Sequence, residues 1–249
     1  MPAALHAIGF LTRVPVPLGP VDPDEPPRLA PAVPWFPLVG ALVGALAGGI
    51  LTLVDLLPGA GPSGVAAALA LAAGIVVTGA LHEDGLADTA DGLGVHGDRE
   101  RRLAVLRDSR LGTFGALALL VWGLTAWSAL RPLRVEDAVL ALVAAGALSR
   151  WAIVLHAAFA TPARPDGAVH ALRVDATTGT LATVAAVLVA MPALGPGGGA
   201  VAIAVAIAVA LLTATGARRA FGGITGDTCG AAAALTQAAV LVVALAFAA

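Results

Sequence analysis

Charge and cysteine are scarce in this sequence, and lysine is missing altogether. Only 12% of the 249 residues are charged, whereas 59% are hydrophobic, and all 14 basic residues are arginine. Soluble domains carry about a quarter of their residues as charged side chains, so the composition excludes an ordinary soluble protein. The single cysteine, Cys229, excludes an internal disulfide, and no Cys or His cluster has zinc spacing. A net charge of −2 gives no special attraction to nucleic acid.

Most of the sequence consists of long, nearly uncharged apolar runs. Each run is close to the roughly 20 residues that a helix needs to cross a bilayer. We therefore predict an all-α, polytopic membrane bundle of about seven transmembrane helices, which forms one domain over residues 1–249. The runs cover residues 35–57, 62–81, 111–130, 138–158, 176–194, 197–217 and 228–249.

The arginines between the runs predict how the bundle is oriented. Eleven lie in one set of loops and two in the other, so the positive-inside rule places the N-terminus in the cytoplasm. Residues 1–34 are then an interfacial segment, and residues 82–112 form a long cytoplasmic catalytic loop. We expect a multi-pass protein of the inner (cytoplasmic) membrane. The eleven are Arg13, Arg28, Arg99, Arg101, Arg102, Arg107, Arg110, Arg164, Arg173, Arg218 and Arg219.

The stretch HEDGLADTADG, residues 82–92, concentrates acidic side chains directly after the second run. We expect the helix of that run to continue into it. At 100° per residue, Asp84, Asp88 and Asp91 then share an arc of roughly 60°, while Glu83 lies about 100° from Asp84. Carboxylates crowded in this way repel one another and need a positive partner. A hard cation such as Mg²⁺, shared with substrate phosphates, fits this need; the alternative is a solvated acidic helix end.

The segment RDSRLGTFG, residues 107–115, precedes the third run. Arg107 and Arg110 lie three residues apart, so on a helix they share a face, with Ser109 as a hydroxyl donor nearby. Two guanidinium groups beside a carboxylate cluster suit a metal-bound diphosphate. The alternative, anchoring at the cytoplasmic face with ion pairs to nearby acids, explains the other arginines of this loop better than it explains this pair.

A third polar segment, GGITGDTCG at residues 222–230, opens the last run. Thr225 or Asp227 can cap a helix here, and free N–H groups at a helix N-terminus favour anions. Whether Asp227 is only a cap or also binds metal or substrate stays open. Within the fourth run, the charged side chain of Arg150 costs free energy in the membrane unless it has a partner or faces a water-filled cavity. We therefore expect it to extend toward the acidic stretch. We expect His156 to be an interfacial residue at a helix end.

Three of these segments together resemble one family. HEDGLADTADGL (82–93), RDSRLGTFG (107–115) and TGDTCGA (225–231) are similar in order and spacing to the cobalamin synthases, the adenosylcobinamide-GDP ribazoletransferases. FLTRVPVP (10–17) and WFPLVGALVG (35–44) extend the resemblance over nearly the whole chain. It implies a Mg²⁺-dependent membrane enzyme late in vitamin B12 biosynthesis. Such an enzyme joins adenosylcobinamide-GDP to α-ribazole, or to α-ribazole 5′-phosphate, and releases GMP.

The resemblance also implies roles for individual residues. Asp84, Asp88 and Asp91 would hold Mg²⁺, with Asp108 or Asp227 completing that site or a second one. The base that takes the hydroxyl proton is left open between a motif carboxylate and His82. Glu83 stands where family members carry an apolar residue, so it is not expected as an indispensable ligand. The residues expected to bind substrate are Arg107, Ser109, Arg110, Arg150, Thr225, Gly226 and Thr228.

Two other functions compete with this interpretation. DTADG contains the D-x-x-D-G core of the CDP-alcohol phosphotransferases, but the Ala-Arg pair that should follow the glycine is absent. A cation transporter also places acids among small-residue helices, near the bilayer midplane. Here the acids lie at a helix boundary beside an arginine pair, which favours phosphate chemistry. A homo-oligomer or a complex with other cobalamin-assembly enzymes is left open.

Overall fold

The computed structural model describes residues 3–17, 29–57, 64–164, 169, 172 and 174–248. Within those residues the protein is built from helices, and the only β contact is an isolated bridge between Pro162 and Ile224. The predicted all-α class is confirmed. The elements are α1 (Ala3–Leu11), the 3-10 helix η1 (Ala30–Trp35), α2 (Phe36–Asp55), α3 (Gly64–Thr78), α4 (Leu81–Gly94), α5 (Arg99–Val105), α6 (Thr113–Leu130), α7 (Val135–Phe159), α8 (Ala176–Phe221) and α9 (Gly226–Phe247).

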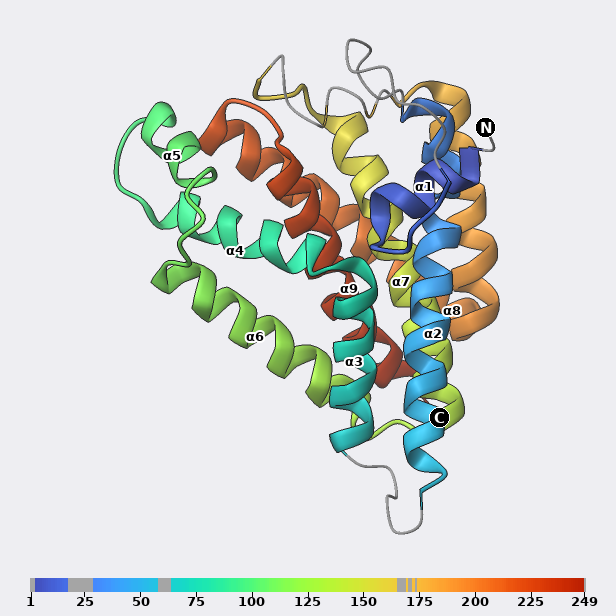
Figure 1. Ribbon diagram of the computed structural model, residues 1–249. Helices are drawn as coiled ribbons and strands as arrows, with labels where there is room; N and C mark the ends of the chain where they lie inside the picture. Colours follow the sequence, from blue (N-terminus) through green and yellow to red (C-terminus); the bar gives the residue numbers. More distant parts are fainter. Residues whose placement is uncertain are drawn as a thin grey trace.

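The helices have the length and composition of a multi-pass membrane protein. Five described segments can each cross a bilayer: η1 with α2, then α6, α7, α8 and α9. The bent pair of α3 and α4 raises that number to six. In Figure 1, α4, α5 and α6 make up the left part of the molecule, α2 and α8 the right part, and α9 runs obliquely between them. The predicted membrane bundle is thus confirmed, while the number seven and the orientation stay predictions.

Helix α8 is a hairpin of two helical segments. Gly195 inside it has non-helical angles, φ 68° and ψ 171°. Thr183 and Thr213 are 30 residues apart, roughly 45 Å along a straight helix. Yet they form hydrogen bonds with Trp151 and His156, which are only five residues apart on α7, roughly 7.5 Å along its axis. The chain therefore reverses at Gly195, and the two halves correspond to the fifth and sixth predicted runs.

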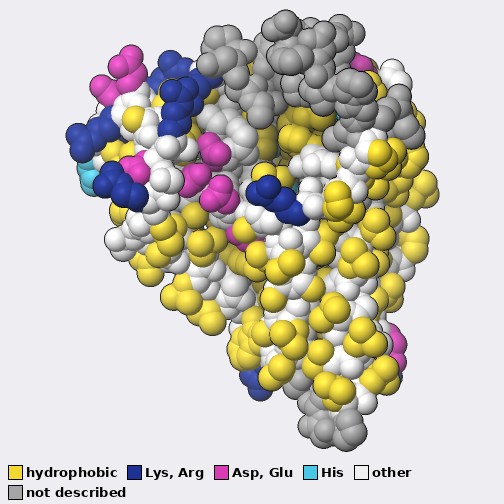
Figure 2. All heavy atoms as spheres, viewed as in Figure 1, with side chains coloured by type: hydrophobic (Ala, Val, Ile, Leu, Met, Phe, Trp, Pro, Cys, Tyr) yellow, Lys and Arg dark blue, Asp and Glu magenta, His cyan; other side chains and the backbone are white. Residues whose placement is uncertain are grey.

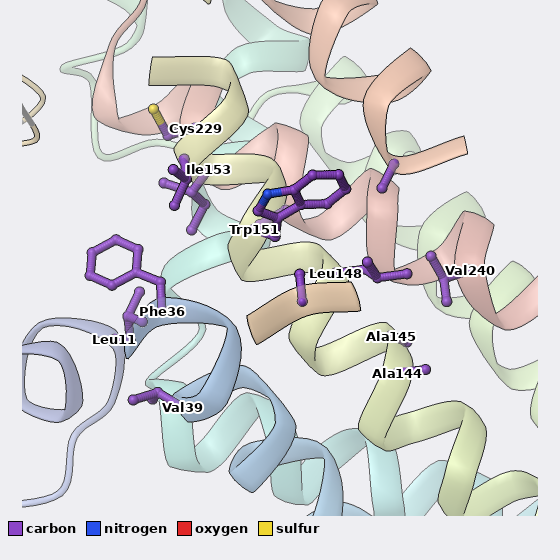
Figure 3. Packing of buried hydrophobic residues seen from close by; sticks show 14 of the residues in the cluster. Leu11, Phe36, Val39, Ala144, Ala145, Leu148, Trp151, Ile153, Cys229 and Val240 are labelled. Atoms are coloured by element: carbon purple, nitrogen blue, oxygen red, sulfur yellow. The ribbon is translucent and has the colours of Figure 1, made fainter. Parts of the chain in front are cut away.

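Small residues let the central helices approach closely. A Cβ atom on Gly40 of α2 would collide with the carbonyl oxygen of Gly146 on α7, and one on Gly44 with that of Leu142. Such backbone contact is how membrane helices associate where lipid removes the hydrophobic drive between them. Helix α7 packs against α2, α8 and α9, and Figure 3 shows its buried Leu148 and Trp151 at the centre of this core.

The outer surface divides into an apolar part and a charged part. Leucines stand exposed along α2 and α6, among them Leu42, Leu46, Leu117 and Leu120. A contiguous exposed apolar surface of this kind suits contact with lipid. Figure 2 shows acidic and basic side chains gathered on the upper left, over α4 and α5, whereas the side chains on the lower part of the same face are mainly hydrophobic.

The second apolar run does not continue into the acidic stretch as predicted. Gly79 and Ala80 both have left-handed angles, φ 65° and 59°, and the helix axis turns by 89° between α3 and α4. Two consecutive left-handed residues end an α-helix. The expectation of one continuous helix is therefore wrong, although the acids still lie on a helix of their own, α4.

The N-terminal segment, predicted to be interfacial, contains a helix that docks on the bundle. Helix α1 packs against η1 and α2, and the rings of Phe10 and Phe36 stack with centroids 5.7 Å apart. Leu11 is fully buried at its end. Arg28 and Arg173, two of the arginines that predict orientation, lie outside the described residues.

Candidate functional site

Helices α4 and α9 cross with their backbones in contact. A Cβ atom on Gly85 would lie 2.6 Å from the carbonyl oxygen of Asp227 and 3.0 Å from the Cα of Gly230. Only glycine at position 85 allows this approach. The crossing brings the acidic stretch of α4 next to the first turn of α9, which are more than 130 residues apart in the chain.

Three carboxylates lie near this crossing, and we call Asp84, Asp88 and Asp227 the acidic cluster. The negative charges of Asp84 and Asp227 act on Asp88, as does that of Asp91 beyond them. Asp84 is exposed, while Asp88 and Asp227 are half-buried. Asp227, whose role was left open between a helix cap and a metal or substrate ligand, thus lies beside the acids of the first motif.

The acidic cluster does not form a complete metal-binding site by itself. Among the described residues, no three His, Cys, Asp or Glu side chains converge closely enough to hold a metal ion by themselves. Mg²⁺ is commonly held by one or two carboxylates together with water and substrate phosphates, so two or three separated carboxylates fit this ion better than a closed site. The donor set therefore fits Mg²⁺ bound jointly with a phosphate ester.

Asp91 has a different task from the other acids of its arc. Its carboxylate accepts hydrogen bonds from the backbone N–H of Gly112 at 2.7 Å and of Gly115 at 2.8 Å. These groups belong to the N-terminal end of α6, where a negative charge is stabilising. A Cβ atom on either glycine would collide with the Asp91 carboxylate. The sequence reasoning missed that these two glycines join the first motif to the second.

The RDSR segment is a loop between α5 and α6, so the expected shared helix face of Arg107 and Arg110 is wrong. Arg110 instead pairs with Asp108, with Nη2 and Oδ2 2.6 Å apart. The hydrogen bonds from Arg110 lower the pKa of Asp108 to about 2. Asp108 is thereby engaged by its neighbour, while Arg107 and Ser109 are exposed at the surface.

The start of α9 has the predicted cap. Thr225 is the N-cap residue, and it forms a capping box with Thr228. The Thr225 hydroxyl also donates to Asp227 Oδ2 at 3.2 Å, which holds that carboxylate at the α4 crossing. Gly226 is exposed between them, and a Cβ atom there would meet nothing within 4 Å. Thr228, by contrast, is buried and used structurally.

His156 lies in the last turn of α7, at a helix end as expected. It is fully buried, and its ring nitrogens lie 3.1 Å from the hydroxyls of Thr213 and of Thr228. One imidazole thus links α7 to both α8 and α9. Its two nitrogens are occupied by these contacts, which fits a structural role.

A second polar group lies in the interior, and we call His82, Glu83 and Arg150 the buried polar cluster. Their exposed fractions are 2%, 9% and 3%. Arg150 donates to Ser149 Oγ at 2.8 Å, and its positive charge acts on both Glu83 and His82. Arg150 therefore lies within electrostatic reach of α4, as expected, but the acid on which its charge acts is Glu83 rather than an acid of the arc, and no hydrogen bond joins these two side chains. An acid off the arc together with an arginine inside an apolar run was the signal for this pairing.

Comparison with known proteins identifies relatives over almost the full chain. The family model described as cobalamin-5-phosphate synthase matches residues 3–245. A protein of Bradyrhizobium diazoefficiens named adenosylcobinamide-GDP ribazoletransferase is 40% identical over 243 residues, which are 97% of this chain and 92% of the relative. Proteins of the same name from Azorhizobium caulinodans and Mesorhizobium japonicum are 40% and 41% identical, each over 94% of this chain, and over 92% and 89% of their own lengths. No solved structure matches the chain.

Proposed function

Because the chain belongs to the cobalamin-5-phosphate synthase family, a family of transferases, we propose that it makes the nucleotide loop of cobalamin. It transfers the adenosylcobinamide-phosphate group from adenosylcobinamide-GDP to α-ribazole or α-ribazole 5′-phosphate. The products are GMP and adenosylcobalamin or its 5′-phosphate. The observation that carries the proposal is the acidic cluster at the α4–α9 crossing, which unites two of the three motifs.

The proposed reaction is a displacement at phosphorus. A ribose hydroxyl of α-ribazole attacks the phosphorus nearer cobinamide, a new P–O bond forms, and the P–O bond to GMP breaks. The hydroxyl proton passes to a carboxylate of the acidic cluster or to His82. Positioning and charge neutralisation carry most of the catalysis in such transfers.

The fit of the acidic cluster supports Mg²⁺ as the cofactor. Asp84, Asp88 and Asp227 would hold the ion, which when bound neutralises charge on the diphosphate. Asp91 positions the N-terminal end of α6 and the loop before it. Arg107 and Ser109, exposed in that loop, bind the outer oxygens of the diphosphate in this proposal, and Gly226 gives a phosphate access to the start of α9.

The test is a defined assay with the full chain in liposomes. Supplied with adenosylcobinamide-GDP, α-ribazole and Mg²⁺, the protein should release GMP and form the cobalamin product in equal amounts. EDTA should stop the reaction and added Mg²⁺ should restore it. Release of CMP from a CDP-alcohol instead, or ion flux without turnover, would overturn the proposal.

We further propose that the protein lies in the cytoplasmic membrane with the acidic cluster on the cytoplasmic side. A cysteine at Glu100, in the first turn of α5, should resist a membrane-impermeant maleimide in intact cells. A matched cysteine at Glu136, at the opposite end of the bundle, should be labelled. Cys229 is buried and gives little background. The reverse labelling pattern would invert the orientation.

A further inference from the structure

An apolar cleft opens beside the acidic cluster. It lies between α1, α4, α7 and α9 and encloses about 250 Å³. Leu11, Ile153 and Cys229 contribute to its wall, and Figure 3 shows their side chains on the same side of α7. Asp84 and Asp227 of the acidic cluster also line it. One cavity thus combines an apolar wall with the carboxylates of the proposed reaction centre.

The same cleft contains a buried side chain without a partner. His82 lines the cavity, is 2% exposed, and neither of its ring nitrogens has a hydrogen-bond partner among the described residues. Burying a polar group without a hydrogen bond is costly, and native proteins seldom tolerate it. His156, the other fully buried histidine of the described chain, has both nitrogens engaged. The unpaired imidazole therefore points to a ligand that supplies the missing partner.

We propose that this cleft binds the aromatic base of the acceptor nucleoside, and that His82 donates a hydrogen bond to the unsubstituted ring nitrogen of that base. The inference rests on the proposed function and adds a binding site to it. The ribose then lies toward Asp84 and Asp227, where its hydroxyl meets the diphosphate.

The size of the cleft limits which part of the two substrates it can hold. Pockets for drug-sized ligands enclose roughly 300 to 1,000 Å³, so a cavity of 250 Å³ holds a bicyclic base and not a corrin ring.

The chemistry of the cleft distinguishes the guanine of adenosylcobinamide-GDP from the base of α-ribazole. Guanine carries several donors and acceptors on its edge, each of which needs a partner when buried. The dimethylbenzimidazole of α-ribazole is a flat apolar ring with one free acceptor nitrogen. An apolar wall with one unpaired imidazole matches the second base, because imidazole offers an N–H donor.

The first experiment removes the two partners of the proposed hydrogen bond separately. Full-length protein in nanodiscs is titrated with benzimidazole riboside and with indole riboside, which has a C–H group in place of the ring nitrogen. We expect the wild-type protein to bind the indole compound about tenfold more weakly, the factor of one neutral hydrogen bond. In His82→Ala the two ribosides should bind equally. A full tenfold preference that survives in folded His82→Ala would overturn the hydrogen bond.

The second experiment fills the cleft without touching His82. Ile153→Phe should raise the KM for α-ribazole by about tenfold or more and leave the KM for adenosylcobinamide-GDP unchanged. Leu155→Phe is the matched control, because Leu155 lies two residues away on α7 and lines a different cavity. It should leave both KM values unchanged. A rise confined to the KM for adenosylcobinamide-GDP would assign the cleft to the other substrate and overturn the proposal.

These results separate the failure of the cleft from the failure of the function. If the wild-type protein releases GMP but the Ile153→Phe variant keeps a normal KM for α-ribazole, only the cleft assignment fails. If the wild-type protein releases no GMP, the proposed function fails, and the riboside titrations still report on the cleft.

Discussion

The two faces of α4 carry acidic side chains in opposite environments. On one face Asp84 and Asp88 meet Asp227 from α9, partly open to solvent. On the other face Glu83 is buried beside His82 and within the field of Arg150 from α7. The neighbours Glu83 and Asp84 thus belong to different clusters. One helix separates carboxylates that repel each other from a carboxylate whose charge is balanced.

This difference shows which charges the fold stabilises and which it leaves for a ligand. A buried charge needs an opposite charge or hydrogen bonds, and the positive charge that acts on Glu83 is that of Arg150. The acidic cluster contains three like charges, a repulsion that a bound cation relieves. Substitutions in the acidic cluster should therefore lower activity, whereas substitutions in the buried polar cluster should lower stability.

The largest effect is expected at the acidic cluster. Asp88→Asn removes the half-buried charge between Asp84 and Asp227, and we expect kcat to fall about 10²- to 10³-fold with an unchanged melting temperature. GMP release and thermal denaturation measure the two quantities. Glu136→Gln, an exposed acid at the far end of the bundle, is the control and should be fully active. A fully active Asp88→Asn variant would remove Asp88 from the reaction centre.

The second-largest effect is expected in the buried polar cluster. Arg150→Met leaves Glu83 as a buried charge without compensation, and we expect the free energy of unfolding to fall by about 3 kcal/mol. Thermal denaturation in detergent micelles measures the loss. The double variant Glu83→Gln/Arg150→Met removes both charges and should recover most of the stability. If the double variant is less stable than Arg150→Met, the two charges do not compensate each other.

A smaller effect is expected at Asp91, which joins α4 to α6. In Asp91→Asn the side-chain amide replaces one accepting oxygen with a donor, so one of the two backbone N–H groups loses its partner at a cost of about 1–3 kcal/mol. Turnover should fall, by less than in Asp88→Asn, because the loop before α6 shifts, while the protein still inserts into the membrane. Gly115→Ala should act in the same direction, since its Cβ collides with that carboxylate. Near-normal activity of both variants would contradict this positioning role.

The smallest effect is expected at Asp108. Its substitution tests whether this acid is as important for activity as those of the acidic cluster. Because Arg110 lowers the pKa of Asp108 to about 2, the pair stays ionised until the pH falls through that value. Stability and activity should therefore not depend on this pair between about pH 5 and pH 9. Asp108→Asn should keep most of the activity, because Asp108 is exposed and engaged by Arg110. A loss as large as that of Asp88→Asn would instead place Asp108 at the metal.

The sequence predicted much of this site because its signals were local. Helical spacing placed Asp84, Asp88 and Asp91 on one arc, and the third polar segment predicted a helix cap at Thr225 or Asp227, of which Thr225 is the one observed. Local spacing failed where the backbone leaves the helix. The bend at Ala80 and the loop at Arg107 both depend on packing that the spacing does not contain.

The sequence by itself determined the class of the protein and the chemistry it offers. Apolar runs without charge require helices in a bilayer, since unpaired backbone groups are too costly in lipid. Only the tertiary structure decided which acids meet. Contact between Gly85 and Gly230 brings Asp227 near Asp88, and a different face of α4 places Glu83 within electrostatic reach of Arg150. The reason is that helix crossing depends on small residues on two distant helices at once, which no local pattern records.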